Sequence, residues 1–95
     1  MTVHELRNEI RRTVGRFERE TPTQFTKEDL AAICDAVTYE TETNRLPPTD
    51  EMRAGILWKI GARPEPDPEA MSGGFRKDEL EAIREYLLDE TRTDA

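Results

Sequence analysis

Residues 25–33 read FTKEDLAAI, and residues 75–83 read FRKDELEAI. In both stretches a phenylalanine is followed by a polar residue, a lysine and two acidic residues, and then by a leucine and an isoleucine. Acidic side chains favour the first turn of a helix, where they meet the positive end of its dipole. The phenylalanine and the leucine occupy positions on either side of a helix cap, where their side chains can touch. Each stretch therefore predicts the start of an amphipathic helix.

A second pair of similar segments precedes these two stretches. Residues 5–15 follow the pattern E-L-R-x-x-I-x-x-x-V-G, and residues 51–61 follow E-M-R-x-x-I-x-x-x-I-G. Apolar residues at intervals of three and four indicate a helix with one apolar face. In the first helix we expect that face to contain Val3, Leu6, Ile10, Val14 and Phe17. Helix caps are predicted at Thr2 with Glu5, at Thr26 with Asp29, and at Thr49. Together with the prolines between the segments, they predict helices over residues 3–20, about 26–43, about 49–60 and 75–90.

The four segments occur in the same order in two halves of the chain. The first pair of segments is offset by 46 residues and the second pair by 50. This order predicts an internal duplication with pseudo-repeats at 2–44 and 48–90, although unrelated helices with the same capping chemistry would also look alike. We expect an all-α fold in which two helix-loop-helix units form one small domain, residues 1–90. Residues 62–74 should form an extended, proline-rich acidic loop, and residues 91–95 a frayed tail.

Each half also resembles the helix-extended-loop-helix modules typified by SAP and Rho N-terminal domains. The similarity lies in a leading helix, a loop, and a second helix that begins with lysine, an acid, leucine and isoleucine at fixed spacing. Many of those modules bind nucleic acid, so the resemblance implies the same for this chain. The loop departs from the SAP pattern because it lacks that family's apolar residues. The matching residues are Lys27, Asp29, Leu30 and Ile33 in the first half and Lys77, Glu79, Leu80 and Ile83 in the second.

The composition is acidic and poor in lysine. The 95 residues carry a net charge of -7, with 21 acidic and 14 basic residues, and 11 of the basic residues are arginine. This balance resembles that of cytoplasmic proteins from salt-loving archaea, although an ordinary acidic protein could share it. The single cysteine, Cys34, excludes an internal disulfide. The N-terminus lacks a secretion signal, and no apolar run is long enough to span a membrane. We expect a cytoplasmic protein with no membrane partner.

Few residues in the chain suggest catalysis. The only histidine, His4, lies in the first turn of a helix, and one histidine with one cysteine cannot assemble a cluster of soft metal ligands. Cys34 lies on an apolar helix face, which predicts a buried thiol. No glycine-rich loop of the phosphate-binding type is present. We expect no enzyme, no catalytic residues, no cofactor, no metal site and no small-molecule site.

The third predicted helix is apolar on two sides. Opposite its main apolar face lies Trp58, with Ala54 and Leu57 beside it. Such a helix is either buried between neighbours or presents one side to a partner, and the sequence leaves both possibilities open. An exposed tryptophan is a frequent anchor of protein interfaces. The leading hypothesis is a non-enzymatic protein-interaction module that uses Ala54, Leu57 and Trp58, and a homodimer through this face is one form of that hypothesis.

The first predicted helix suggests a second function. Arg12, Arg16 and Arg19 would lie on one face of a helix over residues 3–20, and residues 2–20 carry a net charge of +1 while the rest of the chain carries -8. These arginines, together with Lys27 and Lys77, could contact phosphates, so nucleic-acid binding is the alternative hypothesis. The arginines could instead pair with glutamates on the same helix, and the sequence does not decide between the two.

Overall fold

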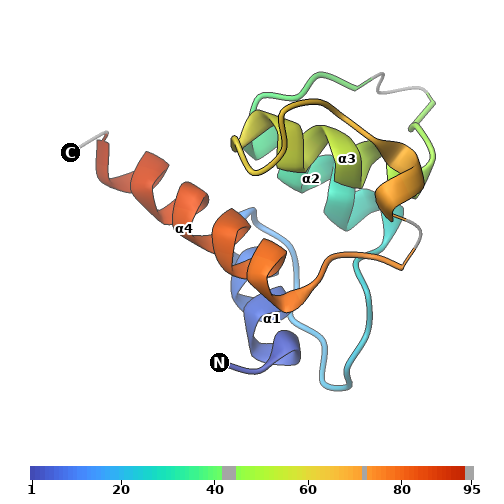
Figure 1. Ribbon diagram of the computed structural model, residues 1–95. Helices are drawn as coiled ribbons and strands as arrows, with labels where there is room; N and C mark the ends of the chain where they lie inside the picture. Colours follow the sequence, from blue (N-terminus) through green and yellow to red (C-terminus); the bar gives the residue numbers. More distant parts are fainter. Residues whose placement is uncertain (42–44, 72, 94–95) are drawn as a thin grey trace.

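The fold is a bundle of four helices. The computed structural model describes residues 1–41, 45–71 and 73–93. Within these ranges there is no strand, and the prediction of an all-α fold with four helices is confirmed. A short 3-10 helix, η1, precedes the last α-helix (Figure 1). The elements are α1 (Val3–Thr13), α2 (Lys27–Ala36), α3 (Thr49–Lys59), η1 (Pro68–Met71) and α4 (Lys77–Thr93).

The first two helices begin with the predicted caps. The hydroxyl of Thr2 accepts a hydrogen bond from the backbone N–H of Glu5, and the Glu5 carboxylate accepts one from the N–H of Thr2. Thr26 and Asp29 make the same pair of hydrogen bonds at the start of α2. Each cap contributes about 1 kcal/mol to stability. The predicted cap at Thr49 is wrong, because Thr49 is the first residue of α3 and no side chain caps that helix.

The helix ends differ from the predictions. α1 stops at Thr13 rather than at residue 20, because Gly15 turns the chain with a φ of +82°, a conformation that favours glycine. Phe17, predicted on the apolar face of this helix, therefore lies in a loop and is 88% exposed. α2 ends at Ala36 rather than near residue 43, and Thr38 follows with a φ of +62°. The end of the predicted helix at 42–43, like the end of the first pseudo-repeat at residue 44, lies outside the described residues.

The loop after α3 is not extended throughout. Its residues Pro68–Met71 form η1, which packs against α3. The side chain of Met71 is buried, and its carbonyl accepts a hydrogen bond from Arg53 of α3 at 3.4 Å. Burial of this one apolar side chain explains why part of a proline-rich loop folds back onto the domain. α4 continues to Thr93, into the predicted tail, and residues 94–95 lie outside the described part.

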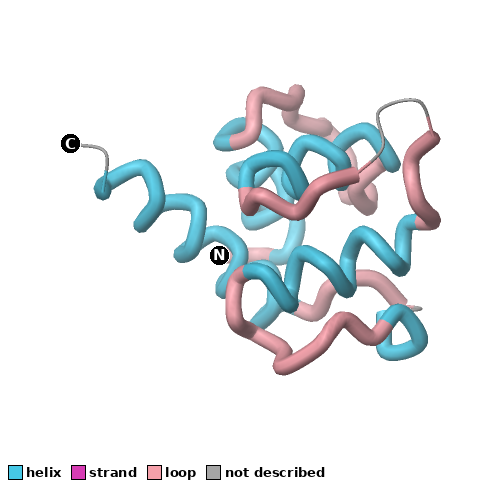
Figure 2. The backbone as a smooth tube through the Cα atoms, turned by 90° about the horizontal axis from the view of Figure 1, so that it is seen from above, coloured by secondary structure: helices cyan, strands magenta, loops and turns pink. Residues whose placement is uncertain are grey.

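The helices pack in two pairs. α1 packs mainly on α4, and α2 packs on α3, so the first helix of each half contacts the second helix of the other half. In both views the C-terminal end of α4 projects beyond the other helices (Figure 2). The side chains that form the core are Leu6, Ile10, Phe25, Leu30, Ile33, Cys34, Val37, Met52, Ala54, Ile56, Leu57, Met71, Phe75, Leu80, Ile83 and Leu87.

The two halves share local features. α1 and α3 are both 11 residues long, and each is followed by a glycine with positive φ, +82° at Gly15 and +81° at Gly61. The phenylalanines that open the two echoing stretches, Phe25 and Phe75, touch edge to face with ring centroids 6.2 Å apart. These features agree with a pair of related units, and the duplication itself stays a prediction.

Candidate functional site

The most prominent aromatic surface lies near the C-terminal end of α3. The side chain of Trp58 is 41% exposed. Its ring lies 6.4 Å from that of Tyr39 at an angle of 89°, and the ammonium group of Lys59 lies 5.4 Å from its centroid. A cation over the face of an indole is attracted to it electrostatically. We call Tyr39, Trp58 and Lys59 the aromatic surface.

The three residues predicted as partner contacts do not lie together at the surface. α3 is the central helix, in contact with α2, η1 and α4, and its residues 52–57 are all buried. Ala54 is 2% exposed and Leu57 is fully buried, so they belong to the core. The prediction that Ala54 and Leu57 contact a partner is therefore wrong, and only Trp58 reaches solvent. The helix is therefore buried among its neighbours over residues 52–57, and contact of its exposed Trp58 with a partner stays a prediction.

Tyr39 is a part of this surface that the sequence reasoning missed. The positive φ of Thr38 turns the chain after α2, and the Tyr39 ring then lies against the backbone of Gly55 in α3. A side chain at position 55 would collide with that ring. Burial, helped by Glu51 and Cys34, raises the pKa of Tyr39, so its phenol stays neutral. A glycine inside a helix was the signal available in the sequence, since it often marks a close approach.

A surface hollow adjoins Tyr39. It has a volume of about 540 Å³ and receives apolar side chains from Ala31 and Leu46 as well as the Tyr39 ring. Two carboxylates, Asp35 and Glu40, add negative charge to its lining, and both residues are exposed. We call this site the Tyr39 hollow; its lining residues are Ala31, Asp35, Tyr39, Glu40, Thr41 and Leu46.

The predicted arginine stripe does not form. Only Arg12 lies on α1, because the helix ends before Arg16 and Arg19. Arg12 pairs with Glu18 at 3.4 Å, and the guanidinium of Arg16 pairs with Asp29 at 3.0 Å. The single helical face is therefore wrong, while nucleic-acid binding by these residues stays a prediction. Lys27 and Lys77 are exposed at the first positions of α2 and α4, without a hydrogen bond or ion pair to the described residues.

A buried arginine, Arg11, was also missed. Its guanidinium donates hydrogen bonds to Asp29 at 3.3 Å and to the side-chain oxygen of Asn8 at 2.9 Å. It also donates to the carbonyls of Thr23 and Gln24, at 2.6 and 3.2 Å. A buried charge is tolerated when it is paired and hydrogen-bonded in this way. Arg11 fastens the loop between α1 and α2 to the domain.

The carboxylate of Asp29 is the partner that Arg11 and Arg16 share. Burial opposes its ionisation, but hydrogen bonds from Arg16, from the backbone of Thr26 and from Arg11 outweigh burial and lower its pKa. Asp29 is therefore ionised at neutral pH. Every partner of this carboxylate is structural, so the cluster stabilises the fold and offers no free group for catalysis.

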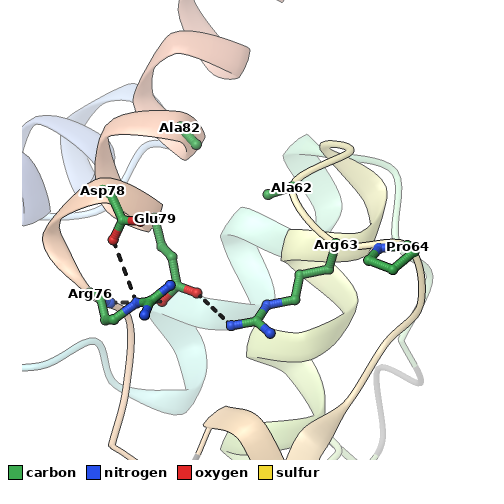
Figure 3. Close-up of a pocket in the computed structure, with 7 residues that line it drawn as sticks. All are labelled: Ala62, Arg63, Pro64, Arg76, Asp78, Glu79 and Ala82. Atoms are coloured by element: carbon green, nitrogen blue, oxygen red, sulfur yellow. Dashed lines mark hydrogen bonds and ion pairs between the residues drawn. The ribbon is translucent and has the colours of Figure 1, made fainter.

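A second set of charges lies in the cleft between the loop after α3 and the start of α4. Figure 3 shows Glu79 between the two segments, with its carboxylate 3.0 Å from Arg63 and accepting the backbone N–H of Arg76 at 2.8 Å. Arg76 also pairs with Asp78 at 3.6 Å. Two guanidinium groups therefore face two carboxylates, and the cleft has no excess charge with which to attract an ion. These ion pairs and hydrogen bonds link the loop after α3 to the start of α4.

Cys34 and His4 are the thiol and the imidazole of the chain, and neither belongs to the charge clusters described above. Burial raises the pKa of the Cys34 thiol to about 12, so the thiolate needed for nucleophilic attack is scarce at neutral pH. His4 is half-buried in α1, with its Nε2 3.3 Å from the side-chain nitrogen of Asn8. Among the described residues, no group of three or more histidine, cysteine, aspartate or glutamate side chains could hold a metal ion.

Comparisons of the chain with protein-family models, with curated proteins and with solved structures find no match. In the part of the chain that the structure describes, no helix combines the length and the apolar character needed to cross a bilayer.

Proposed function

We propose that this protein is a non-enzymatic interaction module that binds another protein chain through the aromatic surface and the adjoining Tyr39 hollow. The observation that supports this proposal is the exposure of Trp58 on a helix whose preceding six residues are all buried. Because the indole is 41% exposed, a partner could bury its remaining apolar area. That burial would contribute about 2 kcal/mol to the free energy of binding.

The geometry around Trp58 favours binding because the ring is already held in place. The Tyr39 and Trp58 rings lie edge to face, the ammonium group of Lys59 lies over the indole, and the Tyr39 ring lies against Gly55. A side chain that is ordered before binding loses little conformational entropy when a partner arrives. Tryptophan and tyrosine are also the residue types in which interface binding energy concentrates.

Replacing Trp58 tests this proposal. Immobilised wild-type chain is incubated with native lysate at the salt concentration of the source cells, and bound proteins are identified by mass spectrometry. We expect Trp58→Ala to weaken binding of the captured partner at least tenfold, and Trp58→Phe to weaken it less because an aromatic ring remains. The dissociation constants would be measured by isothermal titration calorimetry with the purified partner.

Glu81→Ala, an exposed change on α4, is the matched control and should leave the affinity at its wild-type value. Urea unfolding of each variant shows that the fold is intact. If Trp58→Ala captures the same proteins with the same affinity, the aromatic surface is not the binding site and the proposal fails.

A further inference from the structure

The loop between α1 and α2 presents an exposed phenylalanine. The side chain of Phe17 is 88% exposed. Two other large apolar side chains are exposed to a smaller extent, Met1 at 52% and Trp58 at 41%. Aromatic residues are enriched at protein–protein interfaces relative to the rest of the surface, so Phe17 is a candidate anchor for a partner. Packing in the core does not explain a phenylalanine at position 17, since so little of its side chain is buried.

The loop that carries Phe17 is held in place from several sides. The side-chain amide of Asn8 donates to the carbonyl of Arg19 and accepts the N–H of Arg19, both at 2.9 Å. Arg16, next to Phe17, pairs with the buried Asp29, and Arg11 binds the carbonyl of Thr23 further along the loop. Phe17 is therefore displayed by an anchored loop, and such preorganisation lowers the entropy lost on binding.

The Tyr39 hollow complements this loop in shape and in charge. Its volume of about 540 Å³ lies within the range of about 300–1,000 Å³ over which protein pockets take up small molecules, so it can admit one aromatic ring. Arg16 and Arg19 flank Phe17, whereas Asp35 and Glu40 line the hollow. Arg12 and Arg16 are paired with Glu18 and Asp29, so Arg19 is the loop arginine whose side chain has no partner among the described residues, and the lining of the hollow carries -2. Opposite charges at two apolar patches favour contact between them.

We propose that the partner of the Tyr39 hollow is a second copy of this chain, whose Phe17 inserts into the hollow while Arg19 approaches Asp35. This inference rests on the proposed function, because the hollow adjoins the aromatic surface. Phe17 does not fill the hollow of its own chain, since its ring is exposed and no residue of the loop between α1 and α2 is among those that line the hollow. The two patches are different surfaces, so the contact is head-to-tail, and it forms a ring if the rotation closes or a filament if it does not.

Complementation between two variants tests the head-to-tail contact. Phe17→Ser removes the inserted ring but keeps the hollow, and Thr41→Trp fills the hollow but keeps Phe17. Self-association is measured by light scattering after size-exclusion chromatography, up to millimolar concentration and at the salt concentration of the source cells. We expect wild type to associate, each variant alone to be a monomer, and an equimolar mixture of the two to form a one-to-one dimer.

A charge exchange tests the register of the contact. Arg19→Glu and Asp35→Lys should each weaken association at least tenfold, and the double variant should recover it. The side chains of both residues make no interaction with the described part of their own chain, so the thermal unfolding midpoint should stay at the wild-type value. That midpoint also shows whether Phe17→Ser and Thr41→Trp are folded. Glu85→Lys on α4 offers a charge reversal away from both patches and should leave association unchanged.

Three results would overturn the inference: a wild type that stays monomeric, a Phe17→Ser variant that associates like wild type, or a mixture of the two defective variants that does not form a dimer. If the wild type is monomeric but captures a different protein in a manner that depends on Trp58, the self-association fails while the proposed function stands. If the wild type is monomeric and capture does not depend on Trp58 either, both fail.

Discussion

Asp29 joins three parts of the chain with one carboxylate. It caps α2 by accepting the backbone N–H of Thr26, it pairs with Arg16 of the preceding loop, and it accepts a hydrogen bond from Arg11 of α1. The residue is 2% exposed, so these contacts are shielded from water and salt. In a domain of 95 residues with few apolar side chains, such a cluster fixes where the loop lies.

We expect Asp29→Asn to destabilise the protein most at neutral pH. The folded-state pKa of Asp29 is lower than the ordinary value of 3.8, so its charge stabilises the fold fully above that value. The contribution is lost as the pH falls through the folded-state pKa. The cost of Asp29→Asn, about 2–4 kcal/mol near pH 7 for a buried charge with two cationic partners, should therefore shrink below pH 4. Urea unfolding at a series of pH values measures the difference.

Asp35→Asn is the matched control, because Asp35 lies on the same helix and is exposed. Its effect on the free energy of unfolding should stay within about 0.5 kcal/mol at every pH. An Asp29→Asn penalty of equal size at pH 7 and at pH 3 would show that the charge of Asp29 does not stabilise the fold.

Among the elements, α3 has the central position, and Gly55 sets how closely the chain after α2 approaches it. The ring of Tyr39 occupies the space that a side chain at residue 55 would need, and the same ring contacts Trp58. The packing of one element against the next therefore also positions the aromatic surface. An interior glycine weakens a helix by about 1 kcal/mol relative to alanine, and here the close contact offsets that cost.

Gly55→Ala should accordingly lower the free energy of unfolding by about 1–2 kcal/mol, although the same change stabilises most helices. The new methyl group forces the Tyr39 ring to move, so the fluorescence of Trp58 should change as well. Thermal and urea unfolding, together with the emission spectrum, measure both effects.

Gly73→Ala is the matched control, because no atom lies within 4 Å of the added methyl group. The double variant Gly55→Ala with Tyr39→Ala removes the collision, so the penalty for Gly55→Ala should disappear in that background. If Gly55→Ala is more stable than wild type, the Tyr39 ring can move away from the new methyl group without loss of stability, and the prediction is wrong.

At the scale of the whole molecule, the two halves depend on each other. α1 of the first half packs mainly on α4 of the second half, α2 of the first half packs on α3 of the second, and Phe25 meets Phe75 between the halves. Within the second half, α3 also packs on η1 and, to a smaller extent, on α4. This mutual dependence would be expected of two units derived from one, and the duplication remains a prediction.

Fragments 1–46 and 47–95 should therefore be unfolded when separate and should recover helical structure when mixed in a one-to-one ratio. The reason is that α1 packs on α4 and α2 packs on α3 across the two fragments, whereas the contacts of α3 with η1 and with α4 lie within the second fragment. Far-UV circular dichroism of each fragment and of the mixture measures the recovery. A fragment that unfolds cooperatively on its own would contradict the expectation, and scrambled versions of each fragment serve as controls.

The sequence by itself determined the helices and two of their starts, because these depend on residues within four positions of one another. The pairs Thr2 with Glu5 and Thr26 with Asp29 cap their helices as the spacing predicted. The apolar periodicity also placed Leu30 and Leu80 in the core correctly. Local hydrogen bonds and periodic burial require no knowledge of the rest of the chain.

Only the tertiary structure decided which polar residues are buried and which apolar residues are exposed. The apolar periodicity predicted that the first helix would include Phe17, but the helix ends before Gly15. The loop that follows is held by hydrogen bonds from Arg11 to carbonyls more than ten residues away. Likewise, Trp58 meets Tyr39 only because α2 packs on α3. Contacts between distant segments depend on how the helices are arranged, and this is why the exposed Phe17 and the surface around Trp58 could not be predicted from spacing alone.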